Sequence, residues 1–146
     1  MQDLDRQSKK LQIRSEQDAS QGESVRTVYW WEVMKDGMSY QAYFRKAQEL
    51  YAKEGCSKEW KMHHQGGPTG YGCREFTVTP ETKGVIKKNQ AYAWNPTIAG
   101  TKSEDTTFLA DNGVEIFTRT KAWPCTVIET EYGSCSVADI LYMKNE

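Results

Sequence analysis

The hydrophobic and polar positions of the chain separate a polar N-terminal segment from a body with one helical stretch and several extended stretches. Residues 1–24 are rich in glutamine, serine and charged residues and carry only isolated apolar positions. Such a segment buries too little apolar surface to fold, so we predict a disordered or frayed tail. "VRTVYWWEVM", residues 25–34, is the first apolar segment, and its periodicity fits a helix or a strand equally well.

The next stretch has the spacing of one helix face. Its apolar residues recur three and four positions apart, at Tyr40, Tyr43, Phe44, Ala47, Leu50 and Tyr51. Ser39 is a good N-cap residue because its hydroxyl can accept from a free backbone N–H of the first turn. Gly55 favours termination. We therefore predict a helix over Tyr40–Glu54.

After this helix, short β-prone runs alternate with turn residues. We predict strands for "EWKMHH" (59–64), "CREFTVT" (73–79) and "AYAWN" (91–95), the last stopped by Pro96. In "TTFLADNGVEIFT" (106–118), two such runs flank an Asp-Asn-Gly turn, which predicts a β-hairpin. "CTVIETEYGSCSVADILYM" (125–143) adds a strand, a turn at 132–134 and a last short element. The predicted class is α+β, with one main helix on a mostly antiparallel sheet.

Composition and net charge limit the classes of partner that we expect the chain to bind. A chain of 146 residues corresponds to about one domain, and its formal net charge of −1 gives no overall attraction to nucleic acid or an anionic membrane. No apolar run reaches the length of a membrane span. The four cysteines form no Cys-x-x-Cys pair, which favours reduced thiols in a cytoplasmic protein.

Both histidines of the chain stand in "HHQGGPTGYGCREF", residues 63–76. At the end of a strand and before a glycine-rich turn, His63 and His64 are candidates for a general base or a metal ligand. The alternative is that they are ordinary strand residues beside a glycine bulge. A zinc site that adds Cys56 and Cys73 is disfavoured, because the spacing matches no compact structural zinc site. A nucleophilic pair of Cys73 and His64 has no specific signal.

The order of "HHQGGPTGY", "CREF", "AYAWNP", "SEDT" and "NGVEIFT…WP" resembles the C-terminal half of the pita-bread metallopeptidases, the family of aminopeptidase P, prolidase and creatinase. The resemblance runs from Val25 to the C-terminus and implies half of a curved, mostly antiparallel sheet with one packed helix. In the complete family two aspartates, one histidine and two glutamates bind two divalent ions, such as Mn, Co or Zn, which activate a water.

The resemblance carries over unevenly to the metal ligands. Glu104 matches the last metal-binding glutamate. Asn95, in "WNP", stands where the other glutamate is expected, and Gly67 stands where the histidine ligand is expected. The two aspartates are expected upstream of Val25, where nothing resembles their context. We therefore expect weak or no metal binding by this chain.

The remaining site residues are assigned to substrate. His64 or His63 resembles the family histidine that contacts substrate or transfers a proton. Arg74 lies near a second family histidine and suits a substrate carboxylate. Asn95 and Tyr71 complete the predicted substrate-binding set. A half domain also predicts either a homodimer or a complementing N-terminal half as partner.

Three functions follow from the resemblance. The first is an Xaa-Pro aminopeptidase- or dipeptidase-like metallohydrolase acting on N-terminal peptide bonds, present here as a partial or degenerate member. The second is a metal-free hydrolase of the creatinase type. The third is a non-enzymatic peptide-binding module.

The strand prediction fixes the geometry expected at the histidines. Neighbouring residues on a strand point to opposite faces, so one histidine faces the pocket and the other the helix. We favour His64 for the pocket, because the glycines after it leave room for a ligand. His64 and Glu104 are then expected in one cleft, with Asn95 beside them.

Overall fold

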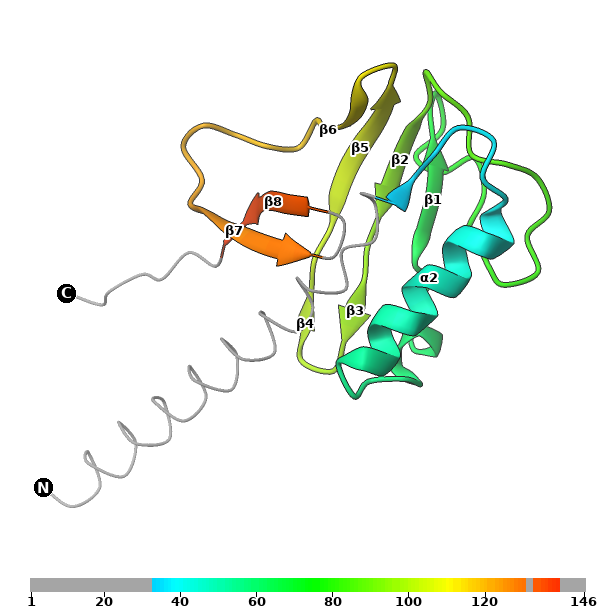
Figure 1. The fold of residues 1–146 in the computed structure, drawn as a ribbon, viewed down its shortest axis with the longest axis horizontal. Coiled ribbons are helices and arrows are strands. Elements are labelled where there is room, and N and C mark those ends of the chain that lie inside the picture. The colour runs from blue at the N-terminus through cyan, green and yellow to red at the C-terminus, as the bar shows by residue number, and fades with distance from the viewer. Residues whose placement is uncertain (1–32, 131–132, 140–146) are drawn as a thin grey trace, which may run out of the picture.

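The computed structural model describes residues 33–130 and 133–139, in which one α-helix packs on antiparallel β-structure (Figure 1). The predicted α+β class is confirmed. The predicted tail, nearly all of "VRTVYWWEVM" and the "ILYM" element lie outside the described residues.

Helix α2 spans Tyr40–Lys53, which confirms the predicted helix with an end one residue earlier than predicted. The Ser39 hydroxyl accepts a hydrogen bond from the Ala42 N–H at 3.1 Å and caps the N-terminus. At the other end Glu54 is the C-cap and Gly55 has a φ of 76°, the left-handed conformation that glycine adopts without strain. The helix buries one apolar face, formed by Tyr40, Tyr43, Phe44, Ala47 and Tyr51.

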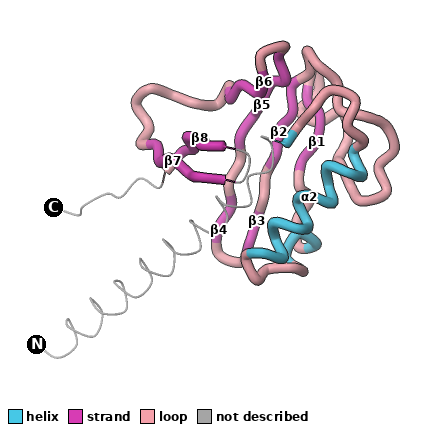
Figure 2. The backbone as a smooth tube through the Cα atoms, in the orientation of Figure 1, coloured by secondary structure: helices cyan, strands magenta, loops and turns pink. Residues whose placement is uncertain are grey.

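The main sheet has four antiparallel strands in the order β1-β2-β5-β6 (Figure 2). These strands are β1 (Gly66–Thr69), β2 (Ala91–Trp94), β5 (Asp105–Ala110) and β6 (Gly113–Ile116). Strands β5 and β6 form the predicted hairpin. Its turn residues are Asp111 and Asn112, and Gly113 has a φ of 128°.

The pairing of β2 with β5 continues beyond the strand ends. Trp94 pairs with Asp105, the Ser103 N–H donates to the Pro96 carbonyl at 3.0 Å, and β3 (Thr97–Ile98) then pairs with β4 (Thr101–Lys102). Asn95 and Glu104 therefore stand opposite one another along this ladder. Residues opposite one another on antiparallel strands project to the same face.

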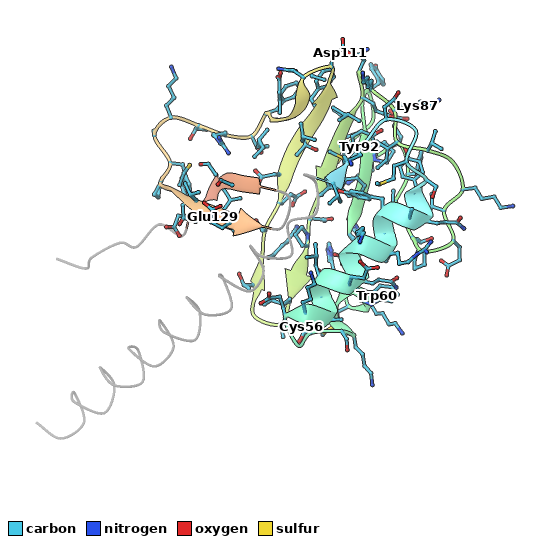
Figure 3. All side chains as sticks on the ribbon, in the orientation of Figure 1. Cys56, Trp60, Lys87, Tyr92, Asp111 and Glu129 are labelled. Atoms are coloured by element: carbon cyan, nitrogen blue, oxygen red, sulfur yellow. The ribbon has the colours of Figure 1, made fainter. Side chains whose placement is uncertain are left out.

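The core lies between α2 and one face of this sheet. Trp94 packs on Tyr43 with ring centroids 4.8 Å apart and on Tyr92 at 5.7 Å, and its indole N–H points to the Met34 sulfur at 3.3 Å. Figure 3 marks Tyr92 in this layer. Strand β5 alternates as its period of two requires, with Asp105, Thr107 and Leu109 buried. The opposite face carries Asn95 and Glu104.

A second hairpin lies beside the main sheet (Figure 1). It consists of β7 (Cys125–Thr130) and β8 (Gly133–Ala138), which pair along their whole length. The predicted strand in this region is confirmed. Gly133 and Ser134 were predicted as turn residues, but they form the start of β8.

Two predicted strands are wrong. "EWKMHH" forms a 3-10 helix, η2 (Glu59–Lys61), followed by a bend. "CREFTVT" forms no regular strand but follows the outer edge of β1, with the Glu75 N–H donating to Pro68 O and the Val78 N–H to Gly66 O. The glycine-rich stretch between them, predicted as a turn, contains β1. Trp60 packs edge-on against Phe44 of α2, which favours a compact turn over an extended strand.

Candidate functional site

The glycines after the histidines are required by the protein's own backbone. A Cβ on Gly66 would lie 2.1 Å from the Ala93 carbonyl oxygen, and one on Gly67 would lie 2.2 Å from the Phe76 carbonyl oxygen. Both distances are impossible for real contacts, so only glycine allows β1 to fit between β2 and the segment that follows it. The space predicted for a ligand is therefore occupied by neighbouring backbone.

The two histidines lie side by side. Their ring centroids are 4.3 Å apart, and Nδ1 of His63 lies 2.7 Å from the His64 carbonyl oxygen, to which it can donate. Both line a cavity of about 420 Å³ that also includes Phe44 and Trp60. The prediction that they face opposite sides is wrong, because the segment is a bend and not a strand.

The side chain of Gln65 holds this bend in place through hydrogen bonds. Its side chain is 1 % exposed, and its amide nitrogen donates to the carbonyl oxygens of Trp60 at 3.1 Å and His63 at 2.8 Å. Its amide oxygen accepts from the Tyr51 hydroxyl of α2 at 2.8 Å. A buried amide with partners on both ends is a positioning element for the histidines.

Glu104 is held by two cations. Nη2 of Arg74 lies 3.2 Å from Oε1 of Glu104, and Nζ of Lys102 lies 2.7 Å from Oε2. The hydrogen bond from Lys102 is the largest cause that lowers the pKa of the Glu104 carboxyl, with Arg74 acting in the same direction against partial burial. Glu104 is thus a carboxylate with both oxygens engaged.

The same charges act on His64. Partial desolvation lowers the pKa of its imidazole, and the positive charges of His63, Arg74 and Lys102 lower it further, while Glu104 opposes them. A lowered pKa leaves the ring neutral at pH 7, able to accept a proton. His64 lines the cavity with His63 and Phe44, whereas Glu104 lines a second cavity with Ile116 and Trp123.

Asn95 is placed beside this cluster by its register with Glu104. Its side chain is 2 % exposed, and its Oδ1 atom has no hydrogen-bond partner among the described residues. Its backbone N–H donates to the Gln65 carbonyl at 3.1 Å. Burying an acceptor without a hydrogen-bond partner costs free energy, so such atoms are uncommon in folded proteins.

One predicted site residue, Tyr71, lies away from the cluster, and one residue of the cluster, Lys102, was not predicted. Tyr71 is fully exposed and lies in the loop after β1. Lys102, which sequence reasoning missed, is the nearest cation to Glu104. The available signal was its position two residues before Glu104 in "KSEDT", because residues two apart on an extended chain share a face.

These residues do not fit a dinuclear metal centre. Within residues 33–130 and 133–139, no group of three or more histidine, cysteine, aspartate or glutamate side chains is placed to hold a metal ion. Glu104 already binds two cations, and Asn95 offers a neutral amide where a carboxylate is expected. A metal would have to displace Arg74 and Lys102 to reach the one matching carboxylate.

Comparison with known proteins identifies the fold. No protein-family profile matches the sequence, and no curated protein matches it significantly. Among solved structures, prolidase from Pyrococcus horikoshii is 21% identical with a TM-score of 0.57, over 75% of this chain and 33% of that one. X-Pro aminopeptidase from Thermotoga maritima is 17% identical with a TM-score of 0.55, over 74% and 32%. A dipeptidase from P. horikoshii is 14% identical with a TM-score of 0.56, over 71% and 30%.

The matched region therefore spans about a third of the length of these structures. Within the described part of the chain, the helices are too short and too polar to cross a membrane. The architecture and the structural neighbours agree with the resemblance seen in the sequence: the described residues have the fold of one part of a pita-bread domain.

Proposed function

We propose that this chain binds peptides through a metal-independent polar cluster, as one part of a pita-bread peptidase-like domain. The cluster consists of Arg74, Lys102 and Glu104, with His64 and Asn95 beside it. The observation that carries the proposal is the pairing of both Glu104 oxygens with side-chain cations. Arg74 and Lys102 together place one more positive charge here than Glu104 neutralises, which suits the carboxylate of a peptide.

Arg74 is the main recognition residue in this proposal. Its side chain is 20% exposed, with Nη1 donating to the Cys73 carbonyl at 3.1 Å and Nη2 to Glu104 at 3.2 Å. Each Nη carries two N–H donors, so the planar guanidinium can hold its present partners and still donate to a peptide carboxylate.

A second candidate function is metal-free hydrolysis with His64 as proton acceptor. The lowered pKa of His64 favours it, because a neutral imidazole beside the cluster can take a proton from an attacking water. A metal-dependent Xaa-Pro aminopeptidase or dipeptidase activity would need further ligands, from a complementing half or a second copy of the chain. We place either activity in the cytoplasm, as the cysteine pattern predicts.

Peptide binding by the full chain tests the proposal. Calorimetry with the dipeptide Ala-Pro, in the presence of EDTA, is expected to show binding that weakens on the order of tenfold or more in Arg74→Ala and when the C-terminal carboxylate is replaced by an amide. Lys58→Ala, at an exposed lysine outside the cluster, is the matched control and is expected to bind as the unchanged chain does. Absence of binding, binding abolished by EDTA, or equal affinities for Arg74→Ala and Lys58→Ala would refute it.

A further inference from the structure

A groove of about 970 Å³ runs between the segments 69–76 and 83–91. It meets β2 at the first residue of the strand, whereas the Glu104 cluster lies beyond the last. Lys87 and Asp111 mark this end of the sheet in Figure 3. The large apolar residues that line the groove are Tyr40, Phe108 and the exposed Phe76, Val85 and Phe117. Exposed apolar side chains gathered in one place are typical of a surface that binds another protein chain.

The ring of Tyr71 projects from the segment that forms one wall of this groove. Tyr71 follows Gly70, which lines the groove, and it is fully exposed. The Thr69 hydroxyl donates to the Cys73 carbonyl at 2.9 Å and the Gly70 N–H to the Gly72 carbonyl at 3.3 Å, so the loop is held closed at its base. A tyrosine on such a loop loses little conformational entropy on binding. One surface therefore carries both a projecting aromatic ring and an apolar groove.

The charged residues of the groove lie on both of its walls. Glu75 lies on one wall, and Lys83 and Lys87 lie on the other. None of these three side chains forms an ion pair with another residue of the described part of the chain, whereas Lys88 pairs with Asp111 at 3.0 Å. Unpaired charges of both signs do not suit a uniform polyanion such as nucleic acid. They are complementary to themselves when a two-fold axis brings Glu75 of one copy opposite the lysines of another.

We infer that this groove is an interface between two copies of the chain, in which the Tyr71 ring of each copy enters the groove of the other. Pockets of roughly 300–1,000 Å³ hold ligands of drug size, so the groove has room for a tyrosine ring. Glu75 of each copy then faces Lys83 and Lys87 of the other. The interface supplies no residue to the Glu104 cluster, so it is independent of the peptide binding proposed above.

Sedimentation equilibrium of the full chain tests the interface. We expect a monomer–dimer equilibrium with a Kd on the order of 10 μM, since a small interface with two aromatic anchors is a weak one. Tyr71→Ala removes both anchors and is expected to weaken the dimer on the order of tenfold or more. Met62→Ala removes another exposed apolar side chain, outside the groove lining, and is the matched control expected to dimerise as the unchanged chain does.

Charge reversal tests the two-fold arrangement. Glu75→Lys places like charges opposite one another, and so does the double variant Lys83→Glu, Lys87→Glu, so each alone is expected to dimerise on the order of tenfold more weakly. All three positions are exposed, so the fold is expected to persist in both variants. An equimolar mixture of the two variants restores opposite charges at both contacts and is expected to recover the affinity.

Three results would overturn the interface. They are a chain that stays monomeric well above the expected Kd, equal dimerisation of Tyr71→Ala and Met62→Ala, and no recovery of affinity in the mixture of charge-reversed variants. None of them bears on the binding of a peptide at Arg74, which is measured separately.

Discussion

Lys102 and Glu104 form an ion pair of 2.7 Å although they are only two residues apart in the chain. The pair is possible because both lie on the extended ladder that joins β4 to β5, where alternate side chains share a face. The carboxylate that the resemblance assigns to a metal ion thus has a cation provided by the chain itself. The negative charge of Glu104 is thus neutralised by the side chains of Lys102 and Arg74.

This relationship predicts a weak response to metal ions. Because Mn²⁺ or Zn²⁺ has to displace Lys102 and Arg74 from Glu104, we expect calorimetric titration of the full chain to show no tight stoichiometric site. The double variant Arg74→Ala, Lys102→Ala frees the carboxylate and is expected to bind either ion more strongly than the unchanged chain. Two tight sites in the unchanged chain would contradict this reading of the cluster.

The titration of His64 provides a test of the cluster's electrostatics. The chain has only two histidines, so their imidazole signals are resolved in a proton NMR spectrum and are assigned with His63→Gln. The His64 midpoint is expected below its ordinary 6.5. Lys102→Ala removes a positive charge and is expected to raise the midpoint, whereas Glu104→Gln removes a negative charge and is expected to lower it. Lys58→Ala, whose charge is not among those acting on His64, is the control.

The sign of the pH dependence of stability follows from the same shift. An unfolded chain protonates His64 near 6.5, and the folded chain protonates it at lower pH. Between these two values the unfolded state binds more protons, so this residue makes the folded state less stable as pH falls below about 6.5. A His64 midpoint above 6.5, or shifts of the same sign in Lys102→Ala and Glu104→Gln, would show that the charges are arranged differently.

The helix and the hairpin were predictable because local patterns determine them. The apolar stripe of Tyr40–Lys53 and the Asp-Asn-Gly turn before β6 need no distant partner to be recognised. The segment around the histidines was not, because its conformation depends on contacts far away in the sequence. Trp60 packs on Phe44, and Gln65 bonds to Tyr51, so a pattern that alternates like a strand folds as a bend.

The close approach of backbone at Gly67 predicts a large effect of a small substitution. In Gly67→Ala the new Cβ meets the Phe76 carbonyl oxygen at 2.2 Å, so β1 or the segment beside it must move. We expect the free energy of unfolding to fall by about 1–3 kcal/mol, the usual cost of overpacking a rigid site. Urea denaturation measures it. Gly72→Ala, whose Cβ would find only an ordinary contact at 3.6 Å, is the control and is expected to stay within about 0.5 kcal/mol.

The candidate site was predictable only in part for a related reason. The resemblance to the pita-bread family marked Glu104, Arg74 and Asn95, and the ladder brings Asn95 opposite Glu104. The role of Lys102 and the cavity beside Trp123 depend on which face each strand presents and on how the β7–β8 hairpin packs. Those are three-dimensional relationships between segments that have no local signature in the sequence.

The last prediction concerns the hydroxyl of Tyr51, which connects helix α2 to the histidine bend through Gln65. It donates to the buried Oε1 of Gln65 at 2.8 Å and accepts from the Thr97 N–H at 2.8 Å. Tyr51→Phe leaves these buried groups without that partner, so we expect a loss of about 1–3 kcal/mol in the free energy of unfolding. Because Gln65 also bonds to the His63 carbonyl, the NMR signal of His63 is expected to shift.

Tyr71→Phe removes the same atom from a fully exposed ring and is the matched control, expected to change neither the unfolding free energy nor the His63 signal. Loss of stability in Tyr51→Phe with an unchanged His63 signal would mean that Gln65 holds the bend without the helix. Equal stability of the two variants would instead show that Gln65 and Thr97 find other partners, and the proposed support of the histidine bend by α2 would have to be abandoned.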